Sequence, residues 1–135
     1  MRAPSDLLES DAPLVPLFVY GTLRSFGALH QRYIGAEVVD AEYATAMGYA
    51  LRDAGMFPLM VREAGQATHG EVMWMRADSP ALRRTIEMEV ATGYALELVE
   101  VEVASTPDPL PVLAFVWQRD TGTAARVPFN DWMAT

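Results

Sequence analysis

Short apolar segments separated by turn residues dominate the chain, and this pattern predicts a fold rich in strands. Residues 14–20 (Leu-Val-Pro-Leu-Phe-Val-Tyr) are almost wholly apolar and end at Gly21, as a buried strand ends at a turn. Further strands are expected at residues 43–51, 59–62, 70–75, 94–103 and 112–117. The last two ranges flank a turn rich in proline and therefore predict an antiparallel hairpin.

The strand expected at residues 94–103 changes face along its length. Its apolar residues occupy even positions from 94 to 98 and odd positions from 99 to 103. Such a phase change predicts a bulge or a barrel corner near Leu98.

Residues 79–90 carry the pattern of an amphipathic helix. Ser79 can cap the free N–H groups and Pro80 suits the first helical position. Apolar residues form one stripe along this helix, at Leu82, Ile86 and Val90. A shorter helix is expected between residues 25 and 35.

Two glutamates of this helix point in different directions. With about 100° of rotation per residue, Glu87 lies on the face opposite the stripe, whereas Glu89 lies at the stripe's edge. Apolar neighbours would raise the pKa of Glu89 toward the range that suits a general base. The alternative is a carboxylate that reaches water or pairs with Arg76, Arg83 or Arg84, and the pattern alone leaves both open.

Length and composition indicate one compact domain. The chain has 135 residues, of which 51% are apolar and 21% charged, so a single core is expected over residues 14–135. Residues 1–13 hold few apolar side chains and are expected to form a flexible arm. Acidic residues stand there in place of the positive charge of a secretory signal, which indicates a cytoplasmic protein.

Charge and residue usage exclude several classes of function. The net charge of −8 repels nucleic acids and anionic membranes, and no apolar run of about 20 residues could span a bilayer. The chain has no cysteine, and its two histidines, His30 and His69, are far apart, so neither a metal site nor a thiolate nucleophile is expected. No serine lies in a G-x-S-x-G context, so covalent hydrolase chemistry is unsupported.

The segment after the first strand is a candidate binding loop. Gly21 would let successive backbone N–H groups converge on an anion or a carbonyl oxygen, with the Thr22 hydroxyl beside them. Taken alone, an ordinary turn is the alternative. Tyr94 follows soon after Glu89 and can present its hydroxyl to the same pocket.

An ordered series of short motifs resembles the γ-glutamylcyclotransferase and AIG2-like family. The family's opening Tyr-Gly-Ser/Thr-Leu loop is matched at residues 20–23, and Glu89 falls where the family places its catalytic glutamate. The resemblance covers about residues 14 to 132. Its other matching segments are Gly48-Tyr49-Ala50-Leu51, Phe57-Pro58-Leu59, His69-Gly70-Glu71-Val72 and Gly93-Tyr94.

This resemblance implies an α+β fold built on a small bent mixed β-barrel with a few surrounding helices. It also implies cyclisation of a γ-glutamyl compound to 5-oxoproline with release of an amine, without metal, cofactor or covalent intermediate. Glu89 would be the base, and backbone N–H groups would bind the glutamyl oxygens. The residues that supply these groups or line the pocket would be Tyr20, Gly21, Thr22, Leu23 and Tyr94.

A binding protein is the alternative function. A catalytically silent AIG2-like module would keep the pocket and recognise a γ-glutamyl or amino-acid ligand. In both hypotheses the partner is a small molecule, and the sequence leaves the leaving group and the oligomeric state open.

Overall fold

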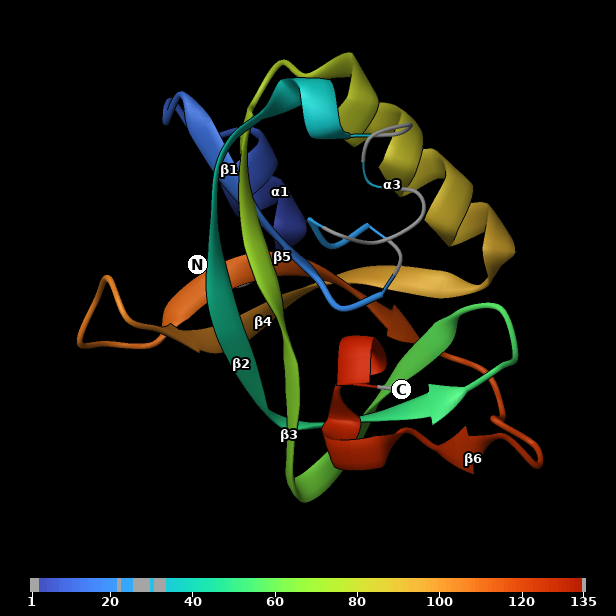
Figure 1. Cartoon of the computed structure of the whole chain (residues 1–135). Coiled ribbons are helices and arrows are strands. Elements are labelled where there is room, and N and C mark those ends of the chain that lie inside the picture. Colours follow the sequence, from blue (N-terminus) through green and yellow to red (C-terminus); the bar gives the residue numbers. More distant parts are fainter. Residues whose placement is uncertain (1–2, 22, 26–29, 31–33, 135) are drawn as a thin grey trace.

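The computed structural model describes residues 3–21, 23–25, 30 and 34–134. Within these residues, six strands and two α-helices are found (Figure 1). The strands are β1 (Leu14–Val19), β2 (Val38–Asp53), β3 (Pro58–Arg76), β4 (Tyr94–Val103), β5 (Leu110–Trp117) and β6 (Ala125–Arg126). The helices are α1 (Pro4–Leu8) and α3 (Pro80–Thr92), with 3-10 turns η1 (Gly35–Glu37), η2 (Pro128–Asn130) and η3 (Trp132–Ala134).

The strands close into a barrel. Their order is β3-β1-β5-β4-β2-β6, and pairing between β2 and β3 joins the ends of the five long strands. Strands β1 and β5 run parallel, whereas the other pairs are antiparallel, so the sheet is mixed. In Figure 1 the two longest strands, β2 and β3, bend together around the barrel, and α3 lies across its upper end. The expected α+β fold with a small bent mixed barrel is confirmed.

Strand β3 differs from its prediction. Residues 59–62 and 70–75 were expected to be separate strands, but β3 continues from Pro58 to Arg76. It can do so because β2, with 16 residues, pairs with both halves of β3, with register shifts between Val38 and Asp40 and between Met47 and Tyr49. Gly48 sits at the second of these shifts with φ of 85°, a conformation that glycine adopts at little cost. Residues 63–66 of β3, opposite Gly48, have no partner in β2, so the strand bulges there without ending.

The hairpin of β4 and β5 is confirmed, but the predicted bulge is wrong. Its register runs without interruption from the pair Tyr94 and Trp117 to the pair Val101 and Leu110. The buried face changes because β2 pairs only with residues 101–103 of β4. Helix α1 contacts both β4 and β5, and Leu98 is partly buried against the core. Different neighbours, and no extra residue, cause the phase change.

Helix α3 begins and ends where capping rules place it. The Leu82 N–H donates to Ser79 Oγ at 3.1 Å, and Gly93 ends the helix with φ of 133°. Leu82 is fully buried and Ile86 partly buried, but Val90 is 49% exposed, so the predicted apolar stripe fails at its last member. The last turn of α3 overhangs a cavity instead of packing on the sheet.

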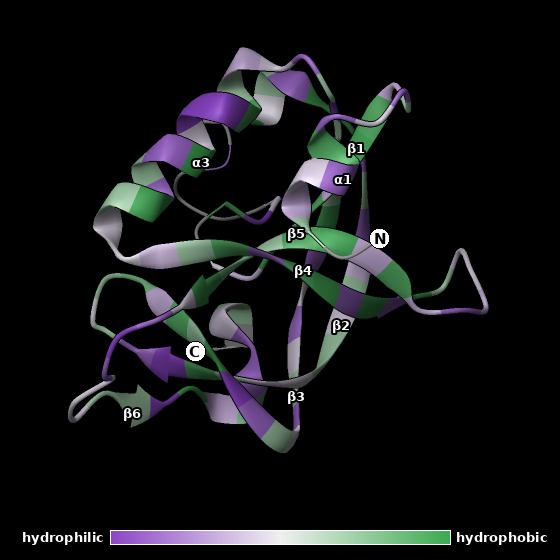
Figure 2. Ribbon diagram, turned by 180° about the vertical axis from the view of Figure 1, so that it is seen from behind, coloured by the Kyte–Doolittle hydropathy of each residue, from purple (hydrophilic) through white to green (hydrophobic). Residues whose placement is uncertain are grey.

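The core fills the barrel and the space beneath α3. Figure 2 shows hydrophobic residues concentrated on β1 and β5, which carry Leu17 and Leu113 as the fully buried partners of a parallel pair. The arm expected at residues 1–13 contains α1, whose Leu7 and Leu8 are partly buried against this core. Its flexibility stays a prediction. The helix predicted between residues 25 and 35 falls mostly outside the described residues, and none of the helices described has the length and apolarity to cross a membrane.

Candidate functional site

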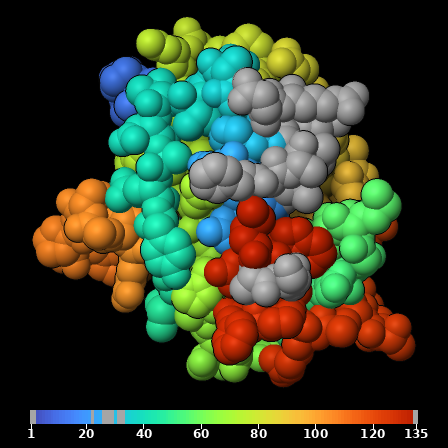
Figure 3. All heavy atoms as spheres, in the orientation of Figure 1, coloured from blue at the N-terminus to red at the C-terminus, as the bar shows by residue number. Residues whose placement is uncertain are grey.

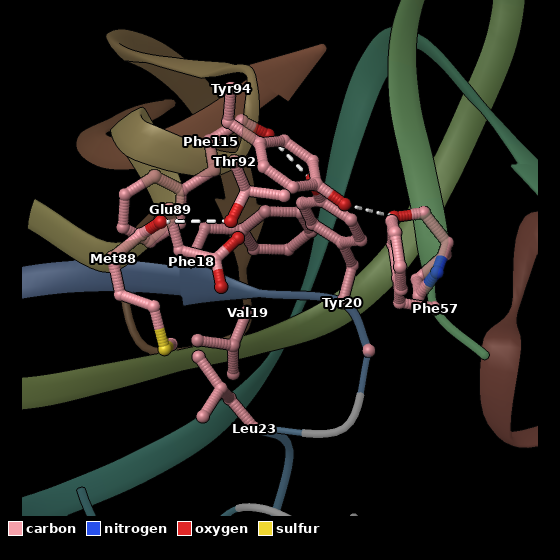
Figure 4. Close-up of a pocket in the computed structure, with 12 residues that line it drawn as sticks. Phe18, Val19, Tyr20, Leu23, Phe57, Met88, Glu89, Thr92, Tyr94 and Phe115 are labelled. Carbon is pink, nitrogen blue, oxygen red and sulfur yellow. Dashed lines mark hydrogen bonds between the residues drawn. The ribbon is translucent and has the colours of Figure 1, made fainter. Parts of the chain in front are cut away.

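A cavity of about 210 Å³ opens between the last turn of α3 and the end of β1 (Figure 4). The start of β3 and the first residues of β4 complete its walls. Most of its lining is apolar and includes Phe18, Val19, Leu23, Phe57, Met88 and Phe115. An apolar pocket with a few convergent polar groups is the usual form of a small-molecule site.

The structure brings the predicted site residues together at this cavity. Tyr20, Gly21, Leu23, Glu89 and Tyr94 all line it, although they come from separate parts of the chain. Thr22, the remaining predicted member, lies outside the described residues. Glu87 is exposed and is not among the lining residues, as the helical pattern predicted.

Glu89 is the acidic group of the cavity. Its side chain points from α3 toward the space beside Phe18 and the two tyrosines (Figure 4). Burial raises the pKa of the Glu89 carboxyl above its ordinary value of 4.5. Within the described part of the chain this carboxyl has no hydrogen-bond or ion-pair partner, so the expected alternative of an arginine pair is not found. The Glu89 carboxyl can therefore gain or lose a proton without breaking an interaction with another described residue.

Tyr20 closes the inner end of the cavity at the end of β1. Its hydroxyl donates to the Phe115 carbonyl at 2.6 Å, and the Met60 N–H bonds to the same hydroxyl oxygen. Burial raises the Tyr20 pKa well above its ordinary value, and the ionised forms of Tyr94 and Glu89 would raise it further. Tyr20 is therefore a neutral phenol fixed to two strands.

Tyr94 stands at the start of β4, directly after the glycine that ends α3. Its hydroxyl donates to the Pro58 carbonyl at 2.7 Å, and its ring packs edge-on against Trp117 with 5.0 Å between centroids. Burial raises the pKa of Tyr94, and the nearby Glu89 carboxylate raises it further. The Tyr94 hydroxyl is therefore protonated at neutral pH.

Gly21 is required by packing rather than by an unusual backbone angle. A Cβ built at this position would lie 2.9 Å from Cγ and Cδ of Pro58. Gly21 does not adopt a left-handed φ. Because Pro58 also accepts the Tyr94 hydrogen bond, this contact links the β1 loop to the opposite wall.

A group of charged side chains holds the loop after β1. Glu71 accepts hydrogen bonds from Ser25 N at 2.9 Å, from Ser25 Oγ at 2.7 Å and from Arg24 Nε at 3.3 Å. Arg24 also pairs with Asp131 at 2.7 Å. The C-terminal segment, red in Figure 3, lies against the barrel beside β2, so this pair ties it to the β1 loop. His30 adds a contact through Nδ1, which lies 2.8 Å from the Leu23 carbonyl oxygen.

The model of the family described as "Gamma-glutamyl cyclotransferase, AIG2-like" matches residues 17–134. The chain belongs to this family. The match includes the end of β1 from Leu17 onward, all of α3 and every described residue that lines the cavity. No curated protein matches the chain.

Solved structures share this family's fold. A protein from Arabidopsis thaliana is 18% identical, with a TM-score of 0.70, over 93% of this chain and 84% of that one. An uncharacterized protein from Pyrococcus horikoshii is 28% identical, with a TM-score of 0.62, over 89% and 91% of the two chains. An AIG2-like protein from Mus musculus is 19% identical, with a TM-score of 0.65, over 82% of each chain.

Several features of this family member were not predicted as parts of the site. Thr92 and Met88 line the cavity because the last turn of α3 overhangs it, while Phe57 reaches it from the turn before β3. The segment that contains Glu71 is one of the family-like motifs, but its contact with Arg24 joins residues 47 positions apart. Among the described residues, no group of three His, Cys, Asp or Glu side chains could hold a metal ion.

Proposed function

We propose that the protein is a γ-glutamylcyclotransferase that converts a γ-glutamyl amine or peptide into 5-oxoproline and a free amine. The observation that carries this proposal is Glu89, a carboxyl group without a described protein partner, with a raised pKa, at an apolar cavity beside the β1 loop. A carboxylate of this kind is suited to accept a proton and return it.

The proposed reaction is an intramolecular acyl transfer. Glu89 takes a proton from the α-ammonium group of the substrate, and the resulting amine attacks the γ-carbonyl carbon of the same molecule. Glu89 then donates that proton to the leaving amine as the bond from this carbon to the amine nitrogen breaks. Glu89 is then a carboxylate again, and the ring nitrogen, which still carries two hydrogens after the attack, loses one of them to solvent to give the neutral 5-oxoproline ring.

Enclosure supplies the second contribution. The substrate must fold so that its α-amine meets its own γ-carbonyl, and a small cavity can hold it in that shape. Backbone N–H groups of the loop that begins at Gly21 would stabilise the negative oxygen that develops on the γ-carbon. The Glu71 contacts with Arg24 and Ser25 support this role because they fix the loop's far end.

The direct test is the release of 5-oxoproline. Purified protein is incubated with a panel of γ-glutamyl amines and γ-glutamyl dipeptides, and 5-oxoproline is quantified chromatographically. We expect release from at least one substrate, and no change in its rate after treatment with EDTA. A ligand that binds in calorimetry while no panel member yields 5-oxoproline would instead support the silent binding module.

A further inference from the structure

Three hydroxyl groups that line the cavity already donate hydrogen bonds to the protein. A hydroxyl carries one proton, so a hydroxyl that donates to the protein can offer only its lone pairs to a ligand. Tyr20, Thr92 and Tyr94 each donate to a backbone carbonyl, and Figure 4 draws these three hydrogen bonds. The three acceptors are the carbonyl oxygens of Phe115, Met88 and Pro58.

The two tyrosines differ in what their oxygens have left to offer. The Tyr20 oxygen donates to one strand and accepts the Met60 N–H from another, so it is held on both sides. The Tyr94 oxygen donates to the Pro58 carbonyl, and no described residue donates to it. Tyr94 also lines the cavity together with Glu89 and lies close enough to feel its charge.

We propose that the Tyr94 hydroxyl oxygen is a second acceptor for the α-ammonium group of the substrate, beside the Glu89 carboxylate. This inference rests on the proposed function and deepens it, because it makes Tyr94 a residue that selects ligands carrying a protonated amine. Tyr20, by contrast, shapes the cavity without binding the ammonium group.

With this arrangement, the two sides of the cavity offer different groups to a substrate. Acceptors gather on the side of α3 and β4, while Gly21 and Leu23 bring the backbone of the loop after β1 to the other side. The ammonium group of a substrate would therefore face Glu89 and Tyr94, and its carboxylate would face the loop. After Glu89 takes one proton, a remaining N–H still donates to Tyr94, which keeps the nitrogen lone pair directed toward the γ-carbonyl.

The test compares two ligands that differ in one group. L-Glutamate carries the α-ammonium and glutarate lacks it, while neither has an amine to release, so binding is measured without turnover. Their affinities are measured by calorimetry for the wild type, Tyr94→Phe and Tyr20→Phe. We expect the wild type to prefer glutamate. Tyr94→Phe should weaken glutamate binding about tenfold, the effect of one hydrogen bond to a charged group, and leave glutarate binding unchanged.

Tyr20→Phe is the matched control, because it removes a buried hydroxyl from the same cavity. It should change the affinities for both ligands by the same factor. The proposal is overturned if the wild type binds glutamate no better than glutarate, or if Tyr94→Phe leaves the ratio of the two affinities unchanged. A panel without 5-oxoproline together with the expected ratios would overturn the proposed reaction but leave the ammonium site standing.

A second variant guards against misfolding. Tyr94→Phe removes the hydrogen bond to the Pro58 carbonyl and so could disturb the start of β3. A fluorinated tyrosine at position 94 keeps the size of the ring and donates more strongly to Pro58, but its oxygen accepts more weakly. Glutamate affinity should fall and glutarate affinity should stay constant, and equal affinities before and after fluorination would overturn the proposal.

Discussion

Glu89 lines the cavity, whereas Glu71 binds the loop after β1, and the protein treats these two carboxylates in opposite ways. Glu71, behind the loop after β1, accepts three hydrogen bonds from Arg24 and Ser25. Glu89, on α3, has no described partner for its carboxyl, and burial raises its pKa. A carboxylate that is fully engaged by the protein fixes structure, while one left without partners in an apolar site remains available for chemistry.

The difference also explains why the loop wall needs such a network. Backbone donors are effective only when they are held in place before the substrate arrives. Strand β1 ends at Val19, and charged side chains from β3 and the C-terminal segment bind Arg24 in the described part of the loop that follows. On the opposite wall, a capped helix already supplies the rigidity.

Removal of the free carboxylate should have the largest effect. Glu89→Gln keeps the size of the side chain but removes the proton acceptor, so turnover of γ-glutamyl substrates should fall by about 10²-fold to 10⁴-fold. Substrate binding should persist with somewhat lower affinity. Steady-state kinetics and calorimetry on the same preparation separate the two effects.

Glu87→Gln is the control for this variant, because Glu87 is exposed on the same helix and does not line the cavity. It should leave turnover within about twofold of the wild type, as expected for a surface substitution. Inactivation by Glu87→Gln, or full activity of Glu89→Gln, would contradict the assignment of the base.

Closing the space beside the loop should have the next largest effect. In Gly21→Val the new Cβ would meet Pro58 at 2.9 Å, so either the loop or the start of β3 must move. Because Pro58 holds the Tyr94 hydroxyl, both walls would shift, and calorimetry should detect no binding of γ-glutamyl ligands. Thr22→Ala leaves the backbone donors in place and should be milder. Equal losses for the two variants would assign the binding role to the Thr22 hydroxyl.

Disruption of the engaged carboxylate should act on stability before chemistry. Glu71→Gln places an amide where Arg24 and Ser25 both donate, which should lower the free energy of unfolding by about 1.5 to 3 kcal/mol. KM should rise because the loop is less well held, while kcat should change little. Denaturant titration and kinetics measure these quantities.

Glu63→Gln is the matched control on the same strand. Glu63 also faces two arginines, and the hydrogen bonds from Arg126 and Arg52 lower its pKa, but it does not line the cavity. Its KM should equal that of the wild type. A similar rise in KM for both variants would show that loss of charge on β3, rather than the hold on the loop, causes the effect.

The sequence was sufficient for features that depend on local rules. The cap at Ser79 and the apolar period of the predicted helix placed Glu89, but not Glu87, toward the interior, although the helix ends at Thr92 and not at the predicted Val90. These local rules do not predict pairing between segments that are distant in the sequence. The continuous β3 depends on its pairing with the long strand β2, and the exposure of Val90 depends on a cavity built by other elements. The contact of Arg24 with Asp131 spans 107 positions, so no window along the chain contains it.

The smallest effect should appear in the pH dependence of stability. Burial raises the pKa of Glu89 in the folded protein above its ordinary value of 4.5, so the folded state binds this proton more tightly than the unfolded state. The contribution of Glu89 to stability is therefore fully present below the unfolded pKa and is lost as the pH rises through the folded pKa. Glu89→Gln does not titrate, so its melting temperature should exceed that of the wild type by a margin that grows over this range. Because the side chain is partly exposed, we expect a margin below about 1 kcal/mol, or roughly 5 °C.

Glu71→Gln, measured in parallel, should be less stable than the wild type at neutral pH. If the margin of Glu89→Gln instead shrinks with rising pH, the folded protein stabilises the Glu89 carboxylate as it does that of Glu71, and the prediction is wrong.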